Sequence, residues 1–165
     1  MASTPGTRYV WLGAGRTLRT RVDGPAEGGA GPVLACCNGL GVSTFCWDPQ
    51  VEFLRHERSV LTWDYRGHGL SSEPSDPGEM TIERCADDLE RVLAARGIEE
   101  VVTLGHSMGV QVILEHLRRH PGRVRGLVPV LGTYGRPLDT FFDAPLRSHA
   151  SFAVARRSEE RRVGK

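Results

Sequence analysis

The stretch VVTLGHSMGVQVILEH, residues 101–116, decides how the rest of the sequence is interpreted. Its first residues, Val101–Leu104, form an apolar run that is typical of a buried strand. Apolar side chains then recur at helical spacing over Met108–His120, and Pro121 stands just beyond the end of that predicted helix. Residues 105–109, between the two elements, read Gly-His-Ser-Met-Gly. This arrangement predicts a serine on a sharp strand-to-helix turn.

The residue types around that turn have a physical reason. A reversal this tight forces Ser107 into strained backbone angles and brings neighbouring segments close together. Gly105 and Gly109 relieve the crowding because they carry no Cβ. The serine hydroxyl is then held above the sheet edge, where the helix N-terminus offers partial positive charge to a developing oxyanion. The alternative is a turn that contains serine and two glycines by chance, and the strand-and-helix context disfavours it.

Strand and helix patterns alternate along the rest of the sequence. Strands are predicted at Tyr9–Leu12 and Thr17–Val22, which form a hairpin, and at Val33–Cys37, Ser59–Trp63, Val101–Leu104 and Val124–Leu131. Helices are predicted within Trp47–Glu57, between the cap Thr81 and the terminating Gly97, and over Met108–His120. Strands that alternate with helices of this length indicate an α/β fold, with a parallel sheet covered on both faces. The strand C-termini, and any site, then share one edge.

Two further glycine-rich motifs follow the two preceding strands. Residues 38–41, after Val33–Cys37, read Asn-Gly-Leu-Gly, and residues 64–71, after Ser59–Trp63, read Asp-Tyr-Arg-Gly-His-Gly-Leu-Ser. Together with the serine turn, these motifs resemble the α/β-hydrolase fold superfamily in order and spacing, over residues 7–140. The family's versions are His-Gly-x-Gly, Asp-x-Arg-Gly-x-Gly-x-Ser and Gly-x-Ser-x-Gly.

The resemblance implies a mostly parallel sheet of the α/β-hydrolase type and the serine hydrolase branch of the family. Ser107 corresponds to the nucleophile. The backbone N–H groups of Leu40 and Met108 correspond to the oxyanion hole, and Gly105 and Gly109 support the turn. Serine at this position, rather than aspartate, argues against alkyl-enzyme chemistry.

The other motif residues are expected to shape the loops. Asn38 departs from the family's histidine, but its short side chain can still bond the loop backbone beside Gly39. Asp64 and Arg66 are expected to hold their own glycine-rich loop through side-chain hydrogen bonds. His68 could be read as a general base, and we reject that interpretation for the same reason.

The remaining members of the triad are expected beyond this sequence. In the family the order along the chain is serine, then an acid, then histidine. The histidines after the serine are His116, His120 and His149; the first two lie on the helix behind the turn, and the third comes before the family's usual position. The acid is left unassigned, with Asp139 and Asp143 as candidates.

The domain organisation follows from the same comparison. Residues 1–156 are expected to form an incomplete α/β-hydrolase domain, truncated after about the sixth strand, with a helical lid that begins near residue 134. Residues 157–165 contain the only lysine, Lys165, among otherwise exclusive arginine usage, and they resemble translated sequencing adapter. We interpret them as a non-native tail.

The composition and the net charge indicate which classes of partner this protein binds. The 165 residues carry a net charge of +1, which gives no reason to expect nucleic acid. No apolar stretch approaches the roughly 18 residues of a membrane span, and no signal pattern is present, so we predict a cytoplasmic protein without membrane insertion. The four cysteines show no CxxC spacing: Cys36, Cys37, Cys46 and Cys85. No metal or other cofactor is expected. The expected partner is a small-molecule substrate.

The leading hypothesis is hydrolysis of an ester-like carbonyl substrate through an acyl-enzyme at Ser107, with the fragment inactive alone. Esters, lactones, amides and diketone-like substrates all fit that chemistry. Within enzymes, the alternatives are acyl transfer and cofactor-free peroxidase chemistry on the same fold. From another class, the alternative is a non-catalytic binding module, although an intact serine turn and an intact glycine-rich motif at residues 38–41 count against it.

Overall fold

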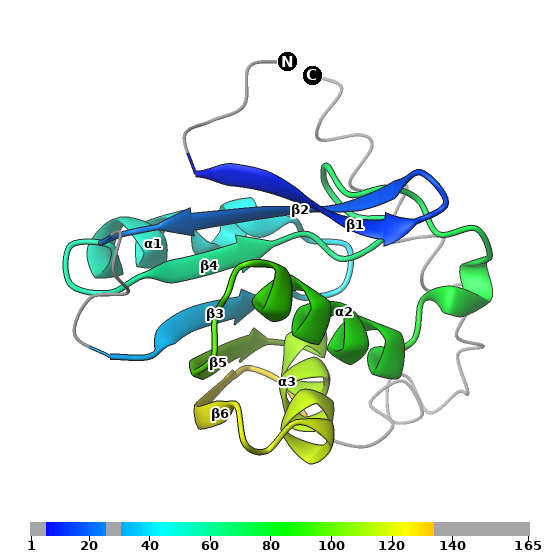
Figure 1. Ribbon diagram of the computed structural model, residues 1–165. Helices are drawn as coiled ribbons and strands as arrows, with labels where there is room; N and C mark the ends of the chain where they lie inside the picture. The colour runs from blue at the N-terminus through cyan, green and yellow to red at the C-terminus, as the bar shows by residue number, and fades with distance from the viewer. Residues whose placement is uncertain (1–5, 26–30, 134–165) are drawn as a thin grey trace.

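The sheet has six strands in the computed structural model, which describes residues 6–25 and 31–133 (Figure 1). The strands are β1 (Thr7–Gly13), β2 (Arg16–Asp23), β3 (Val33–Cys37), β4 (Val60–Trp63), β5 (Val101–His106) and β6 (Val124–Val130). Their order across the sheet is β1-β2-β4-β3-β5-β6. Strands β4, β3, β5 and β6 run parallel, whereas β1 and β2 form an antiparallel hairpin against β4. The prediction of a mostly parallel α/β sheet is confirmed.

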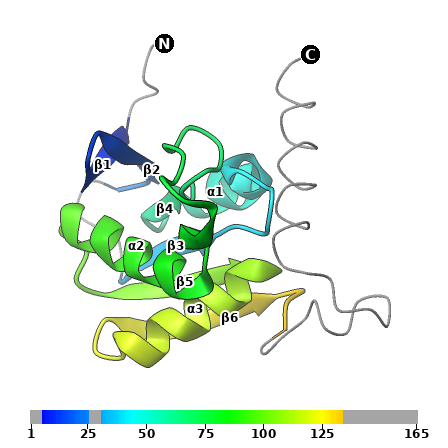
Figure 2. The same ribbon diagram turned by 90° about the vertical axis from the view of Figure 1, so that its right-hand side faces the viewer.

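Helices cover both faces of this sheet. The helix α1 (Asp48–Leu54), preceded by a 3-10 turn η1 (Thr44–Trp47), lies on one face. The longer helices α2 (Ile82–Ala95) and α3 (Met108–Arg119) lie on the other (Figure 2). A second short 3-10 turn, η2 (Pro77–Glu79), lies in the loop that leads to α2. The molecule therefore has three layers, with the sheet between two layers of helices. The C-terminal ends of the parallel strands β4, β3, β5 and β6 lie along one edge of the sheet.

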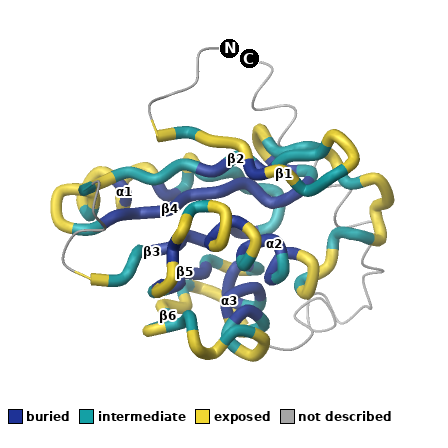
Figure 3. The backbone as a smooth tube through the Cα atoms, viewed as in Figure 1, coloured by how far each residue is buried: buried dark blue, intermediate teal, exposed yellow. Residues whose placement is uncertain are grey.

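The side chains of β3 show how the two cores are divided. Successive strand residues point to opposite faces. Ala35 and Cys37 pack in the larger core with α2 and α3, and Leu34 and Cys36 pack in the smaller core with η1 and α1. All four residues of β4 are buried as well (Figure 3). The run Val33–Cys37, predicted as a strand buried on both faces, therefore lies with β4 at the centre of the sheet.

The predicted elements differ from the structure mainly at their ends. The single helix predicted within Trp47–Glu57 is a 3-10 turn followed by a seven-residue helix. Its beginning follows from Pro49, whose fixed φ suits the first turn of a helix and which has no N–H to leave unpaired. The predicted cap of α2 is confirmed, because Thr81 Oγ1 accepts a hydrogen bond of 3.2 Å from the Arg84 amide. The lid predicted from residue 134 and the tail at 157–165 lie outside the described residues.

Candidate active site

Ser107 forms the turn between β5 and α3 with backbone angles that few residues other than glycine adopt. Its φ is 53° and its ψ is −115°. The turn is fixed on both sides, because the Ser107 amide donates to the Val130 carbonyl at 3.0 Å and its carbonyl accepts from the Val110 amide at 3.1 Å. The residue is exposed. A strained, exposed serine held by its neighbours is a feature found at functional sites.

The two glycines of the turn lie where no side chain fits. A Cβ on Gly105 would stand 2.5 Å from the Gly109 carbonyl oxygen. A Cβ on Gly109 would stand 2.2 Å from the carbonyl oxygen of Cys37, at the end of β3. The start of α3 is thus packed directly against the beginning of the loop at residues 38–41, which we call the oxyanion loop.

The oxyanion loop passes beside the serine. A Cβ on Gly39 would meet Ser107 Cβ at 3.4 Å and His106 Nδ1 at 3.1 Å. Leu40 and Met108 are both half-buried at this junction. Within the described residues, neither of their amides donates a hydrogen bond to a protein acceptor. An amide without a protein acceptor, in the residue after Ser107 or in the loop that passes beside it, could donate to an oxyanion.

Asn38 joins the oxyanion loop to the core. Its Nδ2 donates to the Trp63 carbonyl at 3.0 Å, and its Oδ1 accepts from Trp47 Nε1 at 2.8 Å. Its own carbonyl accepts from the Tyr65 hydroxyl at 3.0 Å. The side chain is fully buried and uses both of its polar ends. These contacts leave Asn38 no role in substrate contact and hold the start of the loop in place.

Asp64 holds the loop after β4 through side-chain hydrogen bonds, as Asn38 holds the oxyanion loop. Its carboxylate accepts from the amides of Thr44 and Leu70, each at 3.2 Å. Burial raises the pKa of this carboxyl, partly offset by those amides and by Arg19. A Cβ on Gly69 would lie 2.5 Å from the carboxyl carbon, so the loop can close around Asp64 only with glycine there.

The Arg66 side chain forms a buried ion pair with Asp88 on α2. Its Nε and Nη2 contact the two carboxylate oxygens of Asp88 at 2.8 and 2.7 Å, and its Nη1 contacts Glu79 at 2.9 Å. The Asp88 hydrogen bonds are the main cause of a raised Arg66 pKa. Sequence reasoning did not identify Asp88; the available signal was an acidic residue beside apolar positions of an amphipathic helix.

His68 has no free nitrogen for proton transfer at the serine. Its Nε2 lies 3.2 Å from the Gly41 amide, and its Nδ1 lies 3.2 Å from the Arg66 carbonyl. His116 is fully buried, and its Nε2 lies 3.1 Å from Glu90 between α2 and α3. Burial lowers the His116 pKa, against the opposing effect of Glu90. Within the described residues, no hydrogen bond joins an imidazole to the Ser107 hydroxyl. The candidates His149, Asp139 and Asp143 lie outside those residues.

The cysteines are free thiols packed in the structure. Cys36, Cys37 and Cys85 are buried, and Cys46 is half-buried. Desolvation raises the pKa of Cys37 to about 12 and that of Cys46 to about 11. Thiols with such values are largely protonated near neutral pH and are poor nucleophiles.

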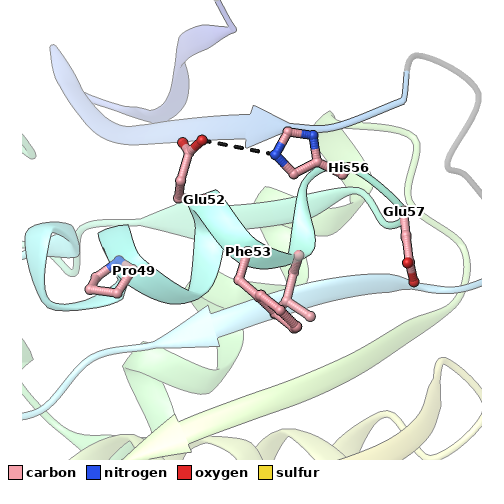
Figure 4. Close-up of a pocket in the computed structure, with 6 residues that line it drawn as sticks. Pro49, Glu52, Phe53, His56 and Glu57 are labelled. Atoms are coloured by element: carbon pink, nitrogen blue, oxygen red, sulfur yellow. Dashed lines mark ion pairs between the residues drawn. The ribbon is translucent and has the colours of Figure 1, made fainter.

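Over residues 6–25 and 31–133, no group of three or more histidine, cysteine or acidic side chains could hold a metal ion. The helices of the same ranges are all too short or too polar to cross a membrane. A surface hollow beside α1 is lined by residues 49–57 alone, with Glu52 and His56 3.9 Å apart (Figure 4). It involves neither the serine turn nor the oxyanion loop.

The chain is similar in sequence and fold to proteins that are named hydrolases, an esterase and a lactonase. A family model described as the alpha/beta hydrolase fold matches residues 32–153. The curated protein "Putative carbamate hydrolase RutD" of Caulobacter segnis is 34% identical over 105 residues, which are 64% of this chain and 39% of that protein. The chain therefore spans well under half the length of this relative.

Solved structures agree. The esterase RhEst1 from Rhodococcus sp. ECU1013 is 32% identical with a TM-score of 0.69, over 79% of this chain and 48% of that one. The enol-lactonase from Burkholderia xenovorans LB400 is 32% identical with a TM-score of 0.65, over 73% and 45%. A hydrolase from Pseudomonas aeruginosa PA01 is 31% identical with a TM-score of 0.71, over 79% and 48%.

Proposed function

The chain belongs to the alpha/beta hydrolase fold family, and from that premise we propose that Ser107 is the nucleophile of a serine hydrolase acting on an ester-like carbonyl substrate. The observation that carries the proposal is the position of Ser107. It is exposed, has a φ of 53°, and lies against the oxyanion loop at Gly39. A turn that served only to connect β5 to α3 would have no need of this strained serine or of free amides beside it.

The proposed chemistry follows from that geometry. The Ser107 hydroxyl attacks the substrate carbonyl as its proton passes to a histidine base, which an acidic residue orients. Both partners are proposed to come from outside the described residues. The negative charge on the carbonyl oxygen is stabilised by the amides of Leu40 and Met108 and by the N-terminus of α3. The leaving group takes the proton and departs, and water then releases the acyl group from the serine.

The substrate class is drawn from the relatives. They are named a carbamate hydrolase, an esterase and an enol-lactonase. In each of these substrate types a carbonyl carbon bears an oxygen or nitrogen leaving group. An ester, lactone or carbamate is accordingly the proposed class for the full-length protein.

The experiment uses the full-length protein that carries these residues. Purified protein is treated with a fluorophosphonate probe, and its turnover of p-nitrophenyl butyrate is measured. Ser107→Ala should abolish labelling and lower kcat by at least about a thousandfold. Ser43→Ala is the matched control, because Ser43 lies near the oxyanion loop and its hydroxyl makes no cap hydrogen bond. A folded full-length protein that neither labels nor turns over esters would favour the non-catalytic binding module.

A further inference from the structure

His68 links the loop after β4 to the oxyanion loop through both of its ring nitrogens. The Gly41 amide can only donate, so Nε2, 3.2 Å away, must be the acceptor. The Arg66 carbonyl can only accept, so Nδ1, also 3.2 Å away, must carry the proton. The two contacts together define a neutral imidazole with its proton on Nδ1. The residue is 5% exposed, so water competes little for either contact.

The His68 ring also packs against Tyr65, and the two residues contact opposite ends of the oxyanion loop. Tyr65 and His68 meet edge to face, with ring centroids 5.7 Å apart. The Tyr65 hydroxyl donates to the Asn38 carbonyl at 3.0 Å. Tyr65 therefore holds the first residue of the oxyanion loop and His68 holds its last residue, Gly41. Leu40 lies between these two fixed points.

From this arrangement we propose that His68 is a positioning residue for the oxyanion hole: as a neutral acceptor it fixes the Gly41 amide and so holds the neighbouring Leu40 amide toward Ser107. The inference rests on the proposed function. His68 does not touch substrate and transfers no proton. The loop residue Gly41 has a φ of 66°, and glycine backbone is the part of the loop most in need of an external restraint.

Two isosteric variants separate the two hydrogen bonds. The Gln carboxamide reaches the place of Nε2, so His68→Gln keeps an acceptor for Gly41 and loses the donor to Arg66. The shorter Asn carboxamide reaches the place of Nδ1, so His68→Asn keeps the donor and loses the acceptor. Both variants remove the ring, and both should lose similar stability. Any difference between them in catalysis then reports on the Gly41 contact.

The test compares kcat and KM for p-nitrophenyl butyrate in the full-length protein, with the free energy of unfolding measured for each variant. We expect His68→Asn to have a kcat at least about tenfold below that of His68→Gln, with KM changed little, because a displaced oxyanion donor affects the transition state most. Equal kcat values, or a lower value in His68→Gln, would overturn the proposal. So would a kcat that simply follows the loss of stability.

A second measurement does not depend on catalysis or on either variant folding. Nitrogen-15 NMR of the histidine rings in the unmodified full-length protein should show His68 neutral, protonated on Nδ1, with Nε2 bonded to the Gly41 amide. A ring protonated on Nε2 at neutral pH would overturn the inference. Absence of Ser107-dependent labelling would instead remove the proposed function, while this NMR result would stand.

Discussion

Replacing Gly109 by alanine tests the close packing that places the oxyanion loop beside the serine. In an ordinary helix, glycine to alanine is stabilising by up to about 1 kcal/mol. At this position the new Cβ would lie 2.2 Å from the Cys37 carbonyl oxygen and 2.9 Å from that of Asn38. Both neighbours are backbone atoms, which cannot rotate away as a side chain could.

The expected magnitude follows from that distance. A carbon and a carbonyl oxygen approach to about 3.3 Å at the closest, so α3 and the end of β3 must separate by about 1 Å. Overpacking of this kind costs about 1–3 kcal/mol against a helical gain of about 1 kcal/mol, so the expected net loss of stability is at most about 2 kcal/mol. Catalysis should suffer more, because a displacement of about 1 Å at a reacting group can lower the rate about a hundredfold.

The assay compares Gly109→Ala with Gly122→Ala in the full-length protein, by urea unfolding and by kcat/KM for p-nitrophenyl butyrate. Gly122 is a suitable control because a Cβ there meets no atom within 4 Å. We expect the control to stay within about 0.5 kcal/mol of the parent in stability. If Gly109→Ala were as stable and as active as the parent, the packing of α3 against the oxyanion loop would be wrong.

Three further changes follow from the buried and charged groups. Asp88→Asn should lower the free energy of unfolding by about 1.5–3 kcal/mol, because it removes the buried carboxylate of Asp88 and leaves Glu79 as the remaining carboxylate partner of Arg66. Asp87→Asn on the surface should cost less than about 1 kcal/mol; equal losses in urea unfolding would refute the buried pair. The pKa of Glu115 is lowered from 4.5 to about 2 by hydrogen bonds from two neighbouring arginines, so its stabilisation is present above pH 4.5 and lost as the pH falls toward 2. Glu115→Gln should therefore cost less than about 1 kcal/mol at pH 7 and flatten that acid limb, and an unchanged limb in urea unfolding at pH 7 and 3 would speak against the pairing. Iodoacetamide at pH 8 should leave Cys37 unmodified in the folded protein and reach Cys46 first, as mass spectrometry can show; prompt alkylation of Cys37 would contradict its burial.

The sequence was most informative where local pattern and packing coincide. The apolar run Val33–Cys37 was predicted with the bounds that the structure shows, because a strand buried on both faces tolerates few polar residues. The serine turn could be predicted equally well from the sequence. Gly105 leaves room for backbone atoms of Gly109, and Gly109 leaves room for backbone atoms of Cys37. In both cases the packing requirement restricts which residue types can occupy the position, so it can be recognised in the sequence itself.

Contacts between segments far apart in the sequence could not be predicted in the same way. Asp88 pairs with an arginine 22 residues earlier, and His68 bonds a glycine 27 residues earlier. Each partner is unremarkable in its own segment: an acid on a helix and a histidine in a polar loop. The sheet order, which puts β4 next to β3, brings together the two loops that contain His68 and Gly41.

A crystal structure of the full-length protein after reaction with a phosphonate inhibitor tests the central claim most directly. We predict a covalent bond between phosphorus and Ser107 Oγ, with the phosphoryl oxygen within about 3 Å of both the Leu40 and the Met108 amide nitrogens. An unmodified Ser107, or a phosphoryl oxygen directed away from those two amides, would contradict it.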